Sequence, residues 1–236
     1  MKKITSADPI RAGFRAIVDV YVAPFLQANG FSRRSSGVFF RESGDDFWRV
    51  ACDLRKARGV NLGWATVSVC VGFRSLIDFL WPSEAFNWAI LDRKRPCIMA
   101  ANLGHLRPDG QYHEWRIEPG LNTELISMEI INDLRMYGFQ YFEEFGALPK
   151  AVEAWEEGTR FNLGDHAYLY LAGAYCLMGN SQLARNLFEE RIRELENQYK
   201  QIPNPSFKRE IRTTKILREF LEAKQKESTN DRRDDG

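Results

Sequence analysis

The chain of 236 residues has almost no net charge, because 33 lysines and arginines are balanced by 32 aspartates and glutamates to leave +1. It is therefore not a strongly basic domain, the simplest sign of a nucleic-acid-binding protein, although a local basic patch stays possible. Its longest apolar runs, 64–73 and 97–103, are far shorter than the roughly 20 residues of a membrane-spanning helix. Residues 1–9 contain two lysines with no apolar segment after them, so we expect no secretory signal peptide and no membrane association.

Cysteine is sparse and scattered: Cys52, Cys70, Cys97 and Cys176 form no CxxC pair. Three of them fall in apolar segments, which predicts buried, reduced thiols. Reduced thiols are typical of the cytoplasm, so we expect a cytoplasmic protein. The chain is 44% hydrophobic, which is enough for a folded core without disulfides.

Strong catalytic motifs are missing as well. The sequence contains no G-x-S-x-G, no G-x-x-x-x-G-K-[ST] and no G-x-G-x-x-G. These absences favour a non-enzymatic protein without a cofactor, while the enzyme alternative stays open.

The hydrophobic pattern predicts an α+β fold. After Asp8-Pro9 a helical spacing runs to Asn29-Gly30, with a kink or an early end at Pro24. Alternating residues then predict an antiparallel sheet of about five strands, half-covered by helices, with a β-hairpin at Pro108-Asp109-Gly110. The expected strands are 38–42, 47–55, 64–73, 97–106 and 112–118, with short broken helices over 76–91.

From residue 122 the period becomes helical. One apolar stripe is predicted to contain Leu125, Met128, Ile131, Leu134 and Tyr137. Helices are also expected near Val152, over 165–178 and 181–199, and over 207–226. We therefore expect a sheet domain at 1–157 and a helical C-terminal region at 158–227 that docks on it. The C-terminal region should consist of a helical hairpin and a last helix, and a flexible tail should follow at 228–236.

Two groups of short motifs resemble a bacterial domain family of unknown function. The first is LQANGFSRR at residues 26–34, followed by the strand residues 38–41 and 48–50; the second is 97–108 together with Trp115. Members of that family open with a helix, a Gly-Phe step, basic residues and a strand pair. The resemblance implies an α+β fold and a bacterial source, and it carries over no catalytic residue.

A second resemblance is to one tetratricopeptide-like helical hairpin near the C-terminus. The matching residues are Tyr168, Leu171, Ala172, Tyr175, Gly179, Ala184 and Phe188. There is no second copy 34 residues away, and one repeat cannot bury the core of a solenoid. A lone helical hairpin is therefore the favoured interpretation.

His105 and His113 are the only candidates for a metal site. A hairpin at Pro108-Asp109-Gly110 would pair them, with their Cβ atoms about 5 Å apart. Two imidazoles could then bind a metal ion, but no third ligand can be placed, and a polar pair at an exposed hairpin end is commoner. We therefore predict no metal.

A basic region at 31–60 is the main candidate binding surface. Seven basic and four acidic residues leave a local excess of +3, with phenylalanines and tryptophan between them. Phosphate contact and base stacking are conceivable there, as is steering of an acidic protein. The candidate binding residues are Arg33, Arg34, Arg41, Arg49 and Arg55, and we expect Arg41 and Arg49 to form a forked array.

The charges on two of the expected strands alternate. Glu114, Arg116 and Glu118 lie on one strand, and Asp53 and Arg55 on another. Acid–base catalysis and cross-strand salt bridges both fit this pattern, and salt bridges on an exposed face are much commoner.

The sequence thus favours a non-enzymatic cytoplasmic protein that binds another protein, acidic in character. By analogy, a bacterial immunity or antitoxin-like protein, or an accessory of a defence system, would fit. The alternative is a nucleic-acid-binding protein or an enzyme that uses the polar face of the sheet. A deep pocket with converging polar groups would favour the alternative, and a flat patch would favour protein binding.

Overall fold

The computed structural model describes residues 8–80, 99–157 and 167–234. The chain divides into two compact units, Met1–Gly72 with Met99–Lys150 (unit 1) and Phe73–Ile98 with Ala151–Gly236 (unit 2). The docking of a helical region on a sheet domain that ends at residue 157 stays a prediction.

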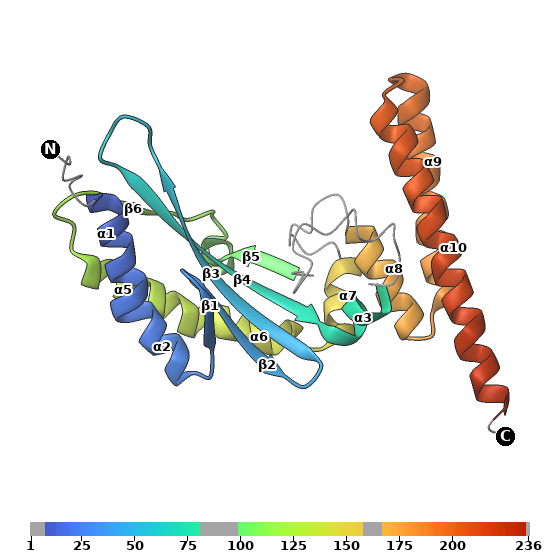
Figure 1. Cartoon of the computed structure of the whole chain (residues 1–236), viewed down its shortest axis with the longest axis horizontal. Helices are drawn as coiled ribbons and strands as arrows, with labels where there is room; N and C mark the ends of the chain where they lie inside the picture. The colour runs from blue at the N-terminus through green and yellow to red at the C-terminus, as the bar shows by residue number, and fades with distance from the viewer. Residues whose placement is uncertain (1–7, 81–98, 158–166, 235–236) are drawn as a thin grey trace, which may run out of the picture. The chain divides into compact units, whose positions relative to one another are not determined.

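Unit 1 combines six strands with two long helices (Figure 1). The strands are β1 (Ser32–Ser35), β2 (Val38–Ser43), β3 (Asp46–Lys56), β4 (Gly63–Phe73), β5 (Met99–Asn102) and β6 (Trp115–Ile117). The first helix is made of α1 (Pro9–Arg15), a π-helical part η1 (Ala16–Val22) and α2 (Ala23–Ala28). The second is made of α5 (Thr123–Asp133), a π-helical part η3 (Leu134–Gly138) and α6 (Phe139–Phe145), and a 3₁₀ turn η2 (Leu103–Leu106) follows β5.

The sheet has the order β1-β2-β3-β4-β5, and β6 pairs with β4 as well. Strand β5 pairs with β4 at Ser68–Val71 and β6 pairs with it at Gly63–Ala65, both antiparallel. The α+β class and the antiparallel sheet are therefore confirmed, and β1 is a strand that the sequence analysis did not predict. The predicted hairpin is wrong, because β5 and β6 lie along the same strand and do not pair with each other.

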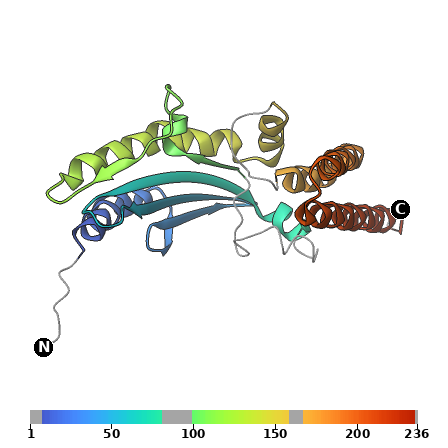
Figure 2. The same cartoon turned by 90° about the horizontal axis from the view of Figure 1, so that it is seen from above.

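Both long helices lie against the same face of the sheet. The odd-numbered residues of β4 face them: a Cβ atom on Gly63 would lie 2.6 Å from Ile10 Cγ2, and one on Gly138 would lie 3.4 Å from Val69 Cγ1. The inward residues predicted for β4 are all buried, namely Ala65, Val67, Val69, Val71 and Phe73. Figure 2 shows α5 and α6 running along one side of the curved strands.

The first helix begins where the sequence predicts. The Asp8 side chain accepts hydrogen bonds from the N–H groups of Ile10 (3.1 Å) and Arg11 (3.3 Å), and Pro9 occupies the first turn. The helix does not end early at Pro24 but continues to Ala28. The π-helical part lies directly before the proline, where the missing N–H and the ring disturb the regular α-helical bonding.

In the second helix the predicted apolar stripe is only partly buried. Leu134 is fully buried, but Leu125 and Met128 are exposed. The face turned to the sheet instead passes through Ile130 and Phe142, and Phe142 stacks on Trp48 of β3 with ring centroids 5.0 Å apart. The residues that the periodicity groups together are thus divided between the core and the surface.

Unit 2 is helical among the described residues. Its helices are α3 (Arg74–Leu80), α7 (Leu148–Glu156, which begins in unit 1), α8 (Ala167–Leu177), α9 (Ser181–Gln201) and α10 (Pro205–Asp234). The predicted helical hairpin is confirmed, since α8 and α9 join through Gly179. The φ angle of this residue is +81°, a left-handed conformation that glycine adopts more easily than other residues. The last helix is confirmed too and extends to Asp234, past residue 226. Of the short helices expected over 76–91, residues 81–91 lie outside the described part.

The expectation of four reduced cysteines is wrong for Cys70, which is disulfide-bonded. Cys52 and Cys176 are free, and Cys97 lies outside the described residues. Burial raises the pKa of Cys52 to about 12 and that of Cys176 to about 11, which makes both weak nucleophiles. Because disulfides are rare in the cytoplasm, cysteine usage no longer supports a cytoplasmic location.

Candidate functional site

The predicted arginine array is not assembled. The β2–β3 register places Arg41 opposite Trp48 and Phe40 opposite Arg49. Residues directly opposite each other share a face and neighbours along a strand do not, so Arg41 and Arg49 lie on opposite faces of the sheet. The expectation of a fork made by these two guanidinium groups is therefore wrong.

Most of the predicted arginines already have partners within the chain. Arg33 Nη2 lies 2.6 Å from Asp19 Oδ1, and Arg34 Nη2 lies 3.7 Å from Glu42 Oε1. The Arg41 guanidinium lies 4.6 Å from the Trp48 ring centroid. Arg55 is paired too, with Glu114, and it belongs to a larger cluster on the face of the sheet that is turned away from the helices.

That cluster surrounds Trp64 and is called here the sheet-face patch. Its members are Arg55, Trp64, Tyr112, Glu114 and Arg116. The Arg55 guanidinium lies 4.7 Å from the Trp64 ring centroid, and Arg116 lies directly opposite Trp64 in the β4–β6 ladder. The indole is therefore flanked by two arginines that come from two different strands.

Glutamates hold both arginines from the edge of the sheet. Arg55 Nη2 donates to Glu114 Oε2 (2.8 Å), and Tyr112 Oη donates to Glu114 Oε1 (3.1 Å). Arg116 Nη2 donates to Glu118 Oε2 (2.8 Å). The predicted cross-strand salt bridge is confirmed for Arg55 and Glu114, whereas the pair of Arg116 and Glu118 lies within one segment. Desolvation, together with the hydrogen bond to Glu114, raises the pKa of Tyr112, so this phenol stays neutral at physiological pH.

The patch owes its side chains to alternation along the segment that enters β6. Tyr112, Glu114 and Arg116 point outward, whereas Trp115 and Ile117 are buried. A strand turns successive side chains to opposite faces, so one short segment supplies both surface and core. The sequence analysis missed Trp64 and Tyr112, although Trp64 is an aromatic residue at an outward position of an alternating strand.

The inward face of the same segment is anchored by an ionic cluster. Arg107 Nε donates to Asp133 Oδ2 (2.8 Å), and Arg107 Nη2 donates to both Asp133 Oδ2 and Glu129 Oε1, the latter at 2.7 Å. The Arg107 guanidinium also lies 5.7 Å from the centroid of the Trp115 ring. Burial alone would lower the pKa of Arg107, but its hydrogen bonds to Asp133 and Glu129 raise it, so this guanidinium stays charged.

Asn102 and Gly104 fix the position of this segment. The Asn102 Oδ1 atom accepts hydrogen bonds from the N–H groups of Gly104 (2.9 Å) and His113 (3.2 Å), and its Nδ2 donates to the His113 carbonyl (3.3 Å). A Cβ atom on Gly104 would lie 2.6 Å from the His113 nitrogen, which leaves room only for glycine.

The two candidate histidines have separate partners. His105 Nδ1 lies 3.0 Å from the Gly110 carbonyl oxygen, and its ring contacts Tyr112. His113 Nε2 lies 3.5 Å from Glu129 Oε1, and its ring meets Trp115 edge-on. Within the described parts of the chain, no group of three or more His, Cys, Asp or Glu side chains could hold a metal ion.

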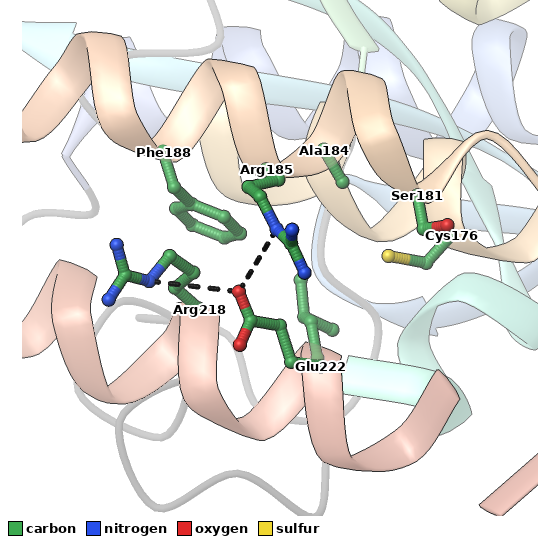
Figure 3. Close-up of a pocket in the computed structure, with 8 residues that line it drawn as sticks. Cys176, Ser181, Ala184, Arg185, Phe188, Arg218 and Glu222 are labelled. Atoms are coloured by element: carbon green, nitrogen blue, oxygen red, sulfur yellow. Dashed lines mark ion pairs between the residues drawn. The ribbon is translucent and has the colours of Figure 1, made fainter. Parts of the chain in front are cut away.

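Two hollows lie outside the patch. One is a shallow, open depression beside the ionic cluster, lined by Arg107, Pro108, Asp109, Glu129, Asn132, Asp133 and Tyr137. The other is a very small hollow in unit 2 between α9 and α10, where Glu222 Oε1 lies 3.3 Å from Arg185 Nε and 3.9 Å from Arg218 Nε (Figure 3). The depression beside the ionic cluster is lined largely by polar and charged side chains, but it is open to solvent and not enclosed.

In residues 8–80, 99–157 and 167–234, no helix combines the length and the apolar character needed to cross a membrane. The resemblance to a bacterial domain family of unknown function stays a prediction. No family model, no curated protein and no solved structure matches the chain.

Proposed function

We propose that this protein binds another protein through the sheet-face patch and has no catalytic activity of its own. The observation that carries the proposal is Trp64, half-exposed, with the exposed Arg55 over its ring and the exposed Arg116 opposite it in the β4–β6 ladder. Tryptophan, tyrosine and arginine dominate the energetics of protein interfaces, and the patch offers all three.

The charge balance of the patch favours a protein over a nucleic acid. Arg55 and Arg116 are each ion-paired with a glutamate, which leaves the patch close to neutral. Nucleic-acid surfaces need an excess of positive charge to replace counterions. Each of these ion pairs nevertheless uses one guanidinium nitrogen, so further donors of both arginines can meet a carboxylate of the partner.

The expected biological setting is a bacterial immunity or antitoxin-like protein or an accessory of a defence system. In such a setting one protein blocks or recruits another by covering its surface, and identification of the bound protein tests this. A cytoplasmic location remains a proposal as well, because the disulfide at Cys70 removes the argument from reduced thiols.

Site-directed photo-crosslinking in the native cell tests the surface. A photoreactive amino acid at position 112, where Tyr112 is exposed, should crosslink to the partner, and the same group at position 20, where Val20 is equally exposed on η1, should not. Crosslinks from position 20 alone would refute the proposed surface, and nucleic acid in place of protein at position 112 would support the alternative function.

Substitutions then measure the contribution of the patch. Trp64→Ala should weaken binding of the identified partner by tenfold or more, since central tryptophans of interfaces contribute about 2 kcal/mol or more. Arg55→Gln with Arg116→Gln should slow association and reduce its salt dependence. The matched pair Arg33→Gln with Arg34→Gln should change little, and the opposite ranking would restore the basic region expected from the sequence.

A further inference from the structure

Unit 1 exposes a row of apolar side chains on its second helix. The exposed fractions are 67% for Leu125, 56% for Met128 and 54% for Met136. The helix does not need them for its own packing, because Ile130, Leu134 and Phe142 already bury its opposite side. Three such residues on one helix differ from the scattered single apolar residues that most surfaces carry.

These three residues form one continuous row, called here the Met row. Leu125 and Met128 are one turn apart, and Asn132 continues the same line to Met136, since positions three and four residues apart are neighbours on a helix. Methionine is flexible and polarisable, and proteins use it at surfaces that accommodate a partner helix. The shallow depression lined by Asn132 and Tyr137 lies directly beside the row.

The helix that carries the Met row is acidic. Between residues 123 and 145 there are five carboxylates and one arginine, a net charge of −4 in a chain of overall charge +1. Arg107 neutralises part of this charge at Glu129 and Asp133, but Glu129 is still 46% exposed. The exposed carboxylates of Glu124 and Glu129 lie next to Leu125 and Met128, so this end of the apolar row is bordered by negative charge.

We propose that the Met row is a docking surface for an amphipathic helix of a partner protein, with lysine or arginine flanking its apolar face. The apolar residues of that helix cover Leu125, Met128 and Met136, and its cations meet the carboxylates beside them. Recognition of an amphipathic helix through its apolar face is a recurring mode of binding. Two copies of the acidic helix face would repel each other, which disfavours the pairing of identical faces. The surface is distinct from the sheet-face patch, and its test does not depend on that patch.

The chain offers a direct readout through its five methionines. The full-length protein, labelled with ¹³C at the methionine methyl groups, is titrated with a short synthetic amphipathic peptide of leucine and lysine. A matched peptide carries glutamate in place of lysine. The signals of Met128 and Met136 should shift with the lysine peptide only. The signals of Met99, which is buried, and of Met178, which is in unit 2, should not shift with either peptide.

A pair of variants tests the contact itself. Leu125→Ser should weaken binding of the lysine peptide about tenfold, as expected for loss of one buried leucine. Val60→Ser, at an equally exposed site between β3 and β4, should bind as the natural sequence does. The unchanged Met99 signal shows that each variant remains folded.

Several results would overturn the inference. Equal shifts with both peptides would show that charge plays no part, and equal shifts at Met178 would show non-specific binding. Unchanged affinity of Leu125→Ser would remove the row from the interface. A dimer in sedimentation experiments that Leu125→Ser dissociates would show that a second copy covers the row instead.

Discussion

Replacement of Arg107 should destabilise unit 1 far more than replacement of any exposed arginine. Arg107 hydrogen-bonds to Asp133 through two nitrogens and to Glu129 through one of them, and it covers the Trp115 ring. Asp133 is only 8% exposed, so Arg107→Met leaves a nearly buried carboxylate without its cation. Breaking a fully buried pair in this way costs roughly 3–5 kcal/mol.

Some solvent reaches the pair, since the Arg107 side chain is 19% exposed, so we expect a cost of about 2–4 kcal/mol. Arg116→Met is the matched control: the same change at an ion pair whose arginine is 66% exposed should cost about 1 kcal/mol at most. The double change Arg107→Met with Asp133→Leu should recover most of the loss, because apolar residues can replace a buried ion pair.

Native-state hydrogen exchange is the appropriate assay, because the two units need not unfold together and it measures opening free energies segment by segment. Amides of β6 and α5 should exchange about 30- to 1,000-fold faster in Arg107→Met, the range that corresponds to 2–4 kcal/mol. A loss no larger than that of Arg116→Met would refute the reasoning, as would a double variant less stable than the single one.

Three further outcomes are expected. Gly104→Ala should destabilise the segment before β6 by roughly 1–3 kcal/mol, visible as faster amide exchange there, because its Cβ has no room. Burial raises the pKa of Tyr170 from 10.0 to about 12, so the folded state holds a proton that the unfolded chain loses. The contribution of Tyr170 to stability should be full below pH 10 and fall by about 1.4 kcal/mol per pH unit up to about pH 12, and in urea titrations Tyr170→Phe should lose that much less stability than the natural sequence over this range. Alkylation of denatured, non-reduced protein, read by mass spectrometry, should label Cys52 and Cys176 and spare Cys70, and labelling of Cys70 would contradict the disulfide.

The helices were predictable from the sequence because their signals are local. Asp8 and Pro9 mark the start of the first helix, and Gly179 marks the turn between α8 and α9. The apolar spacing of the second helix predicts the helix itself but not its buried side. Leu125 and Ile130 both belong to apolar repeats, and only packing against the sheet decides that Ile130 is the buried one.

The sheet was predictable where a short turn fixes the register. The pairing of Ser43 with Asp46 leaves a two-residue turn, and it dictates that Arg41 lies opposite Trp48. The sequence therefore contained the information that separates Arg41 from Arg49. The turn at Pro108-Asp109-Gly110 does form, since the Gly110 N–H donates to the Arg107 carbonyl oxygen (2.9 Å). No hairpin follows, because Asn102 ends β5 and caps a 3₁₀ turn before the chain reaches β6.

The sheet-face patch could not be found from residue types alone, because it depends on the register of the segment that enters β6. A shift of one residue would turn Trp115 and Ile117 to solvent and Arg116 into the core, at a large cost in buried apolar area. Asn102, bound to the backbone of His113, opposes such a shift. The residues that stabilise the segment and those that we propose to bind a partner therefore alternate along one strand. Substitutions on its inner side should act on both stability and binding, whereas substitutions on its outer side should act mainly on binding.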